Sequence, residues 1–248
     1  MSTFVLVPGF WLGAWAWDGV VAPLRAAGHA VYPVSLPGCA ERAGEVGEFG
    51  LEAQIADLVE LLVREDLWDV VLVGHSGACA PVGGLADRMP ERIRRLVYLD
   101  AGPIPDGGSV YAMWPPEFRA RAEDAAVGGR LPLPPWEDLL ASNGAMLDGL
   151  DEAALAGFRE RATPQPLAAA EDALRVTGAR DALAHGLVCC AIPLEQVRAL
   201  IASGHPWFAG MDGPNWEMRE LPTGHWPMFS RPADTAAVLA ELAALSPE

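Results

Sequence analysis

Short apolar runs alternate with amphipathic segments through the amino-terminal part of the chain. The runs rich in β-branched and other apolar residues predict β-strands at 3–7, 30–34, 70–73 and 94–99. Apolar residues at helical spacing predict α-helices at 19–27 and 51–63, and a third helix that ends near residue 88. Because strands alternate with helices, we expect a parallel sheet with right-handed crossovers.

The middle of the chain has a different pattern. Residues 103 to about 184 contain many prolines and helical patches, no convincing strand, and the large apolar residues Trp114, Phe118, Trp136, Leu139, Met146 and Phe158. We interpret residues 103–186 as a helical cap. The alternation then resumes, with strands predicted at 187–192 and 216–221 and helices at 194–202 and 232–245. The flanks 1–102 and 187–248 are therefore expected to build one core domain.

Length and charge restrict the class of protein. A chain of 248 residues with 51% hydrophobic residues is long enough to bury the core of one globular domain. Its net charge of -16 opposes binding to nucleic acid or to anionic membranes, which need clustered Lys and Arg. The apolar amino-terminal segment lacks a basic leader, and no later run has the length of a membrane span. We expect a cytoplasmic protein.

Cysteine usage gives no sign of a metal or a disulfide framework. The four cysteines, which include the neighbours Cys189 and Cys190, do not form a C-x-x-C spacing, so we expect small buried residues. Neither a metal nor a cofactor is expected. The partner that we expect is a small-molecule substrate, and a homodimer is left open.

One segment has the pattern of a nucleophile elbow. Gly74-His75-Ser76-Gly77-Ala78 fits G-x-S-x-G except at its last position, where alanine is still small. The predicted strand before it and the predicted helix after it are the context that this tight turn requires. The pattern predicts Ser76 as the nucleophile.

Serine needs an adjacent base, which is usually histidine. Of the five histidines, only His225 lies in a loop directly after the last predicted strand, in Thr223-Gly224-His225-Trp226-Pro227. In a serine hydrolase of this architecture that loop returns to the elbow, so we predict His225 as the base. The other four are His29, His75, His185 and His205.

The sequence resembles the α/β-hydrolase branch that contains plant methylesterases, hydroxynitrile lyases and bacterial carboxylesterases. The segments that carry the resemblance are residues 4–15, 72–77 and 224–225. It implies an α/β-hydrolase fold: a mostly parallel central sheet with helices on both faces and a helical cap. It also implies an oxyanion hole made by the N–H groups of Phe10 and Gly77.

Two departures from these relatives bear on the reaction. Pro8 and Leu12 stand where plant relatives usually have histidines, which reduces the polarity of the pocket. Gly9 and Trp226 stand where the hydroxynitrile lyases have a threonine and a lysine, so cyanohydrin cleavage is disfavoured.

The acid of the triad has no obvious position. Relatives carry an aspartate after the next-to-last strand, but the loop 190–193 of this chain contains no acid. Some α/β-hydrolases carry the acid after the strand that follows the nucleophile, and Asp100 ends that predicted strand. We favour Asp100, and the second candidate is Glu195.

The function that we predict is cleavage of an ester or a related acyl bond through an acyl-enzyme. The apolar cap favours a small, apolar or aromatic substrate, with binding residues expected at Trp11, His75, Trp114, Trp136 and Trp226. One alternative is a lyase, cyclase or decarboxylase that uses Ser76 and His225 as acid–base groups. The other alternative is a small-molecule receptor.

Overall fold

A six-stranded sheet forms the centre of the molecule in this computed structural model, which describes residues 1–246. The strands are β1 (Thr3–Val7), β2 (Ala30–Pro33), β3 (Val70–His75), β4 (Ile93–Leu99), β7 (Ala184–Cys189) and β8 (Trp216–Glu220). They lie in the order β2-β1-β3-β4-β7-β8, and every neighbouring pair is parallel. The predicted fold class is confirmed.

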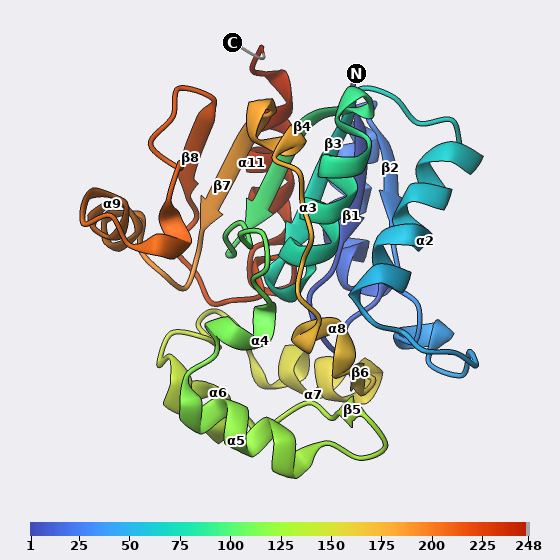
Figure 1. The fold of residues 1–248 in the computed structure, drawn as a ribbon, viewed down its shortest axis with the longest axis vertical. Coiled ribbons are helices and arrows are strands. Elements are labelled where there is room, and N and C mark those ends of the chain that lie inside the picture. Colours follow the sequence, from blue (N-terminus) through green and yellow to red (C-terminus); the bar gives the residue numbers. More distant parts are fainter. Residues whose placement is uncertain (247–248) are drawn as a thin grey trace.

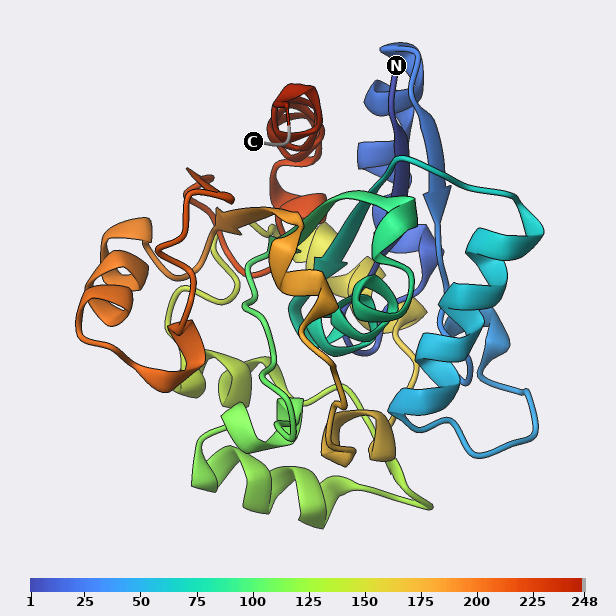
Figure 2. The ribbon, with the colours of Figure 1, turned by 45° about the horizontal axis from the view of Figure 1, so that its top comes forward.

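Helices cover both faces of the sheet (Figures 1 and 2). On one face α1 (Asp18–Ala26) packs beside α11 (Pro232–Ala244), and on the other α2 (Leu51–Arg64) packs beside α3 (Cys79–Arg88). Strand β3 is buried along its whole length, as its unbroken apolar run predicts. Helix α2 buries the apolar stripe Leu51, Ile55, Leu58 and Leu62.

The remaining elements lie in the cap and around the carboxyl end of the sheet. The cap helices lie together beyond that end (Figure 1). They are α4 (Val110–Met113), α5 (Pro116–Ala125), α6 (Trp136–Ser142), α7 (Glu152–Arg161) and α8 (Ala168–Glu171). Outside the cap, α9 (Leu194–Ala202) lies beside β8, and α10 (Pro227–Ser230) precedes α11. No helix in residues 1–246 is long and apolar enough to span a membrane.

The expectation that the middle of the chain contains no strand is wrong. Strands β5 (Arg130–Leu131) and β6 (Gln165–Pro166) pair antiparallel within the cap. Each has two residues, which is too short to show an alternating pattern in the sequence.

Strand β7 is also displaced from its predicted position, since it begins at Ala184 rather than at 187. Gly186 hides this start because glycine is a weak strand former, yet a Cβ there would lie 3.1 Å from Leu242 and 3.2 Å from Val97. The segment before the strand is fixed to the core by Asp87 of α3. The Asp87 carboxylate accepts hydrogen bonds from the backbone N–H groups of Thr177 and Gly178.

Candidate active site

The turn after β3 places Ser76 in a strained backbone conformation above the sheet edge. Its φ is +52°, in the left-handed region that non-glycine residues rarely adopt. The turn is tight because helix and strand approach closely at Gly74, where a Cβ would lie 2.5 Å from Val82. The alanine at position 78 is buried without disturbing this turn. The sequence therefore folds here as a nucleophile elbow.

The structure brings Ser76, His225 and Asp100 together. Ser76 Oγ lies 2.7 Å from His225 Nε2, and His225 Nδ1 lies 2.6 Å from Asp100 Oδ2. The other Asp100 oxygen accepts hydrogen bonds from the backbone N–H groups of Cys190 and Ala191, at 2.8 and 3.1 Å. Because the carboxylate acts as an acceptor throughout, Nδ1 carries the proton and Nε2 is free to accept the serine proton.

The geometry of the sheet explains how Asp100 can serve. Strands β4 and β7 are parallel neighbours, with Leu99 in register with Val188. The loops that follow them therefore begin side by side at the carboxyl edge of the sheet. The loop after β7 has no acid, but it supplies the two N–H groups that hold Asp100. Glu195 lies exposed in the first turn of α9, and no contact joins it to His225 among the described residues.

The loop after β1 lies against the elbow. A Cβ on Gly9 would lie 2.8 Å from the Cβ of Ser76, and a Cβ on Gly77 would lie 2.5 Å from the ring of Phe10. Within residues 1–246, the backbone N–H of Phe10 has no hydrogen-bond acceptor. The N–H of Gly77 is in the first turn after the elbow, where helical N–H groups lack partners. The two predicted oxyanion donors are therefore adjacent to Ser76.

His75 lies behind the site and not in its cavity, contrary to the expectation that it binds substrate. It is fully buried, its Nδ1 accepts from the N–H of Gly9 at 3.3 Å, and its Nε2–H donates to the carbonyl of His225 at 2.7 Å. Burial, and then the neighbouring His225, hold the pKa of His75 well below its usual value. A neutral His75 thus joins the first loop, the elbow and the loop of His225.

A cavity of about 330 Å³ opens above Ser76 and His225. Trp11 and Trp114 lie in its wall, as expected, whereas Trp136 and Trp226 do not. Trp226 is 1% exposed and packs edge-on against Phe158, so these two tryptophans join the cap to the core. The wall residues that the sequence did not single out for binding are Cys79, Ala101, Gly102, Val110, Met113, Pro115, Phe118, Leu139, Asn143, Met146 and Ile192.

The cap holds the loop that carries His225. The N–H of His225 donates to the carbonyl of Met146, and the N–H of Gly224 donates to the carbonyl of Asp148, both at 2.8 Å. A Cβ on Gly224 would lie 2.6 Å from both carbonyl oxygens, so a glycine is required for this approach. The Gly-His pair was visible in the sequence, but its partners in the cap were not.

The cap also holds the first loop. The carbonyl of Trp11 accepts from the N–H of Thr163 at 3.0 Å, and the N–H of Trp11 donates to Gln165 Oε1 at 3.4 Å. Trp11 has a positive φ of +67°, a conformation that these contacts stabilise. Both loops of the site therefore depend on the cap for their positions.

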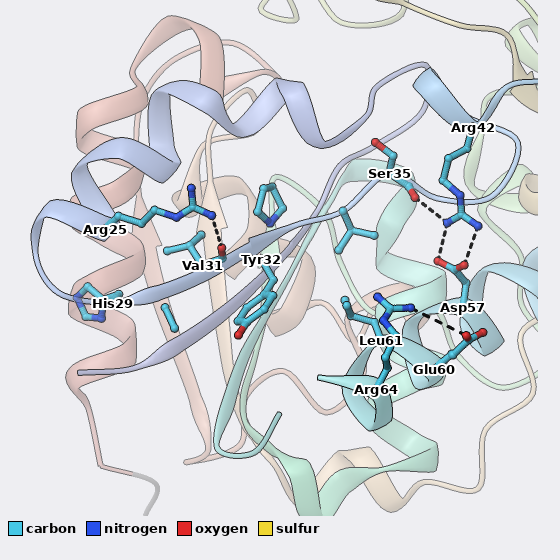
Figure 3. Close-up of a pocket in the computed structure, with 13 residues that line it drawn as sticks. Arg25, His29, Val31, Tyr32, Ser35, Arg42, Asp57, Glu60, Leu61 and Arg64 are labelled. Atoms are coloured by element: carbon cyan, nitrogen blue, oxygen red, sulfur yellow. Dashed lines mark hydrogen bonds and ion pairs between the residues drawn. The ribbon is translucent and has the colours of Figure 1, made fainter. Parts of the chain in front are cut away.

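A larger hollow of about 840 Å³ lies along the edge strand β2 (Figure 3). Two of its arginines have partners: Arg25 donates to the backbone carbonyl of Val31, and Arg42 forms an ion pair with Asp57 at 2.8 Å. His29 Nδ1 accepts from a backbone N–H. Although this hollow is larger, its described residues contain no nucleophile–base pair, and we assign the chemistry to the cavity at Ser76.

The cysteines are free thiols, and all four are buried. Burial raises the pKa of Cys79, which lies in the cavity wall, to about 12, so its thiol stays protonated. Among the described residues, no group of three His, Cys, Asp or Glu side chains is placed to hold a metal ion.

Comparison with known proteins identifies the family. Residues 4–238 match the profile of the alpha/beta hydrolase family. The chain belongs to this family. It is 34% identical over 257 aligned positions to the carbendazim hydrolyzing esterase of Nocardioides sp. (strain SG-4G), an alignment that covers 98% of this chain and all of the relative. The predicted recognition is confirmed.

Two further comparisons extend this result. The putative chloroplastic methylesterase 14 of Arabidopsis thaliana is 32% identical over 43% of this chain and 31% of its own length. The structure of an extracellular α/β-hydrolase from a Paenibacillus species superposes with a TM-score of 0.82 at 24% identity and covers 99% of this chain and all of that one. Because the relatives are named esterases, the comparisons identify the chain as an ester-cleaving α/β-hydrolase. The predicted class of function is confirmed.

Proposed function

We propose that this α/β-hydrolase cleaves carboxylic esters through an acyl-enzyme on Ser76. The observation that supports the proposal is the continuous hydrogen-bonded chain from Ser76 Oγ through the His225 ring to Asp100. This arrangement is recognised by its geometry and by the role of each group, whichever strand supplies the acid.

In the first half of the reaction Ser76 Oγ attacks the carbonyl carbon while its proton moves to His225 Nε2. Asp100 stabilises the resulting imidazolium, and the N–H groups of Phe10 and Gly77 donate to the oxyanion. The bond to the leaving oxygen breaks as that oxygen takes the proton from Nε2. In the second half a water molecule loses a proton to Nε2, attacks the acyl carbon and releases the acid, and Ser76 recovers its proton.

The substrate that we propose is small, with an apolar or aromatic portion. The wall of the cavity is mostly apolar and contains the aromatic side chains of Phe10, Trp11, Trp114 and Phe118. The relative from Nocardioides is named for its action on carbendazim, so carbendazim is one compound to test beside short aryl esters.

A lyase, cyclase or decarboxylase would be favoured if His225 had no acid partner, and the loop after β7 contains no acid. Asp100 supplies a hydrogen-bonded carboxylate to His225, so this condition does not hold. No feature of the described residues favours the receptor alternative.

A labelling experiment tests the serine mechanism. A fluorophosphonate should attach to Ser76, as located by mass spectrometry, and Ser76→Ala should lose both labelling and hydrolysis of para-nitrophenyl esters. The control Ser203→Ala removes a hydroxyl from the exposed end of α9 and should retain both. Unchanged turnover in Ser76→Ala would refute the proposal.

A further inference from the structure

Asn143 places an uncommitted hydrogen-bond donor in the wall of the cavity above Ser76. The residue follows α6 directly, and its Oδ1 accepts from the N–H of Ala145 at 3.0 Å. This bond fixes the orientation of the amide, because only the oxygen can accept. The other branch, Nδ2, has no acceptor among residues 1–246. In contrast, the indole N–H of Trp11 in the same wall already donates to the carbonyl of Leu131.

The position of Asn143 relative to His225 is defined by backbone hydrogen bonds. The carbonyl of Asn143 accepts from the N–H of Met146 at 3.0 Å, and the carbonyl of Met146 accepts from the N–H of His225 at 2.8 Å. Both cap residues also line the cavity. Asn143 therefore belongs to the side of the cavity that adjoins His225.

Another part of the wall continues from the oxyanion loop. The ring of Phe10 packs edge-on against Trp114 with centroids 6.0 Å apart, and Trp114 packs against Phe118 at 5.1 Å. None of the side chains in this aromatic wall has an amide, and the one polar hydrogen among them is the indole N–H of Trp114, which has no acceptor among the described residues. An apolar or aromatic group bound there gains from burial but needs no hydrogen bond.

The mechanism of acyl transfer shows which of these two regions takes the leaving group and which takes the acyl group. His225 Nε2 must reach the leaving oxygen to protonate it, so the leaving group lies on the histidine side. We propose that Asn143 Nδ2 donates a hydrogen bond to an acceptor on the leaving group, while the acyl group packs on the aromatic wall. The preferred substrates are then esters of an apolar or aromatic acid with an alcohol that carries an ether, carbonyl or ring-nitrogen acceptor. This inference rests on the proposed serine mechanism.

Two esters of phenylacetic acid test the inference, the butyl ester and the methoxyethyl ester. Their alcohol portions have the same number of heavy atoms, but only methoxyethyl has an acceptor. The measured quantity is the ratio of kcat/KM for methoxyethyl to that for butyl. Intrinsic reactivity cancels when this ratio is compared between enzymes. We expect Asn143→Leu to lower the ratio by about 3- to 10-fold, as for the loss of one neutral hydrogen bond.

Asn143→Asp distinguishes loss of the N–H donor from distortion of the local fold. Aspartate keeps the oxygen that accepts from Ala145 and loses the N–H donor, so the ratio should fall here too. Met146→Leu is the matched control in the same wall, and it should change kcat/KM for both esters by the same factor. Butyl esters of phenylacetic and pyridylacetic acid place the acceptor on the acyl side, and Asn143→Leu should leave their ratio unchanged.

The outcomes distinguish the inference from the proposed function. If the methoxyethyl-to-butyl ratio is the same in Asn143→Leu as in the unmodified enzyme, the inference is overturned while ester turnover still supports the serine mechanism. If the ratio falls with leucine but not with aspartate, distortion of the cap explains the change and the inference is again overturned. If Ser76 is neither labelled nor needed for turnover, the proposed function itself fails.

Discussion

Replacing Gly224 by alanine tests whether the cap holds His225, the proposed base, in its position beside Ser76. The added Cβ would lie 2.6 Å from the carbonyl oxygens of Met146 and Asp148, roughly 0.8 Å closer than ordinary contact at 3.4 Å. Both partners are backbone atoms, which cannot rotate away as a flexible side chain can. Since the φ of Gly224 is not in the left-handed region, this contact is the main effect of the substitution.

The effect of the substitution on stability follows from the two hydrogen bonds at this contact, which run from Gly224 to Asp148 and from His225 to Met146. Loss of both should lower the free energy of unfolding by about 1–3 kcal/mol. Displacement of His225 by close to 1 Å relative to Ser76 should lower kcat by about 100-fold. KM should change less, because the substitution does not touch the aromatic wall to which we assign the acyl group.

The assay is kcat and KM with a para-nitrophenyl ester, together with the midpoint of urea unfolding. Gly157→Ala in α7 is the control, because a Cβ there meets no atom within 4 Å. It should keep activity and should not lower stability, because alanine is favoured over glycine in a helix interior. A Gly224→Ala enzyme with unchanged kcat would show that the cap does not position His225 and would refute this reasoning.

Three further predictions follow from individual side chains. Asp100→Asn should lower kcat for ester hydrolysis by about 10,000-fold, because its amide N–H would face Nδ1 and impose the wrong tautomer on His225. Glu195→Gln should leave kcat unchanged. If Glu195→Gln lowered kcat and Asp100→Asn did not, Glu195 would be the acid. His75→Leu leaves the N–H of Gly9 unpaired and should lower the free energy of unfolding by about 2–4 kcal/mol in urea titrations, and full stability would contradict the role given to His75. Burial lowers the pKa of His185 to about 4. Between pH 6.5 and pH 4 the unfolded chain therefore binds a proton at this histidine, whereas the folded protein does not. The free energy of unfolding thus falls as the pH falls through this window. At pH 5 this decrease in the free energy of unfolding should be about 2 kcal/mol, and His185→Phe should abolish it. The measurement is Tm against pH, which should be flatter for the variant than for the unmodified protein.

Periodicity could predict most of the core because the sheet is parallel and covered on both faces. The run 70–73 has no polar residue and lies wholly inside the sheet. Local patterns failed where a short or small-residue segment takes its conformation from distant contacts. The two-residue strands β5 and β6 and the start of β7 at Ala184 are of this kind.

The candidate site shows the same division. Ser76 and His225 are predictable because each stands at a fixed place relative to a strand. Asp100 is favoured in the sequence only through the resemblance to α/β-hydrolases that carry the acid at this place, because no local pattern shows that β4 and β7 are neighbours. The tryptophans were ambiguous, since Trp11 and Trp226 are equally apolar in sequence, and only packing decides that one lines the cavity and the other is sealed against Phe158.

The way in which Asp100 is held has a practical consequence for altering the enzyme. The loop after β7 reaches the carboxylate through main-chain N–H groups alone, so the identity of its side chains is not constrained by the acid. One of them, Ile192, is 41% exposed and borders the cavity. Mutagenesis at position 192 can thus vary the wall of the cavity without removing a hydrogen bond to Asp100.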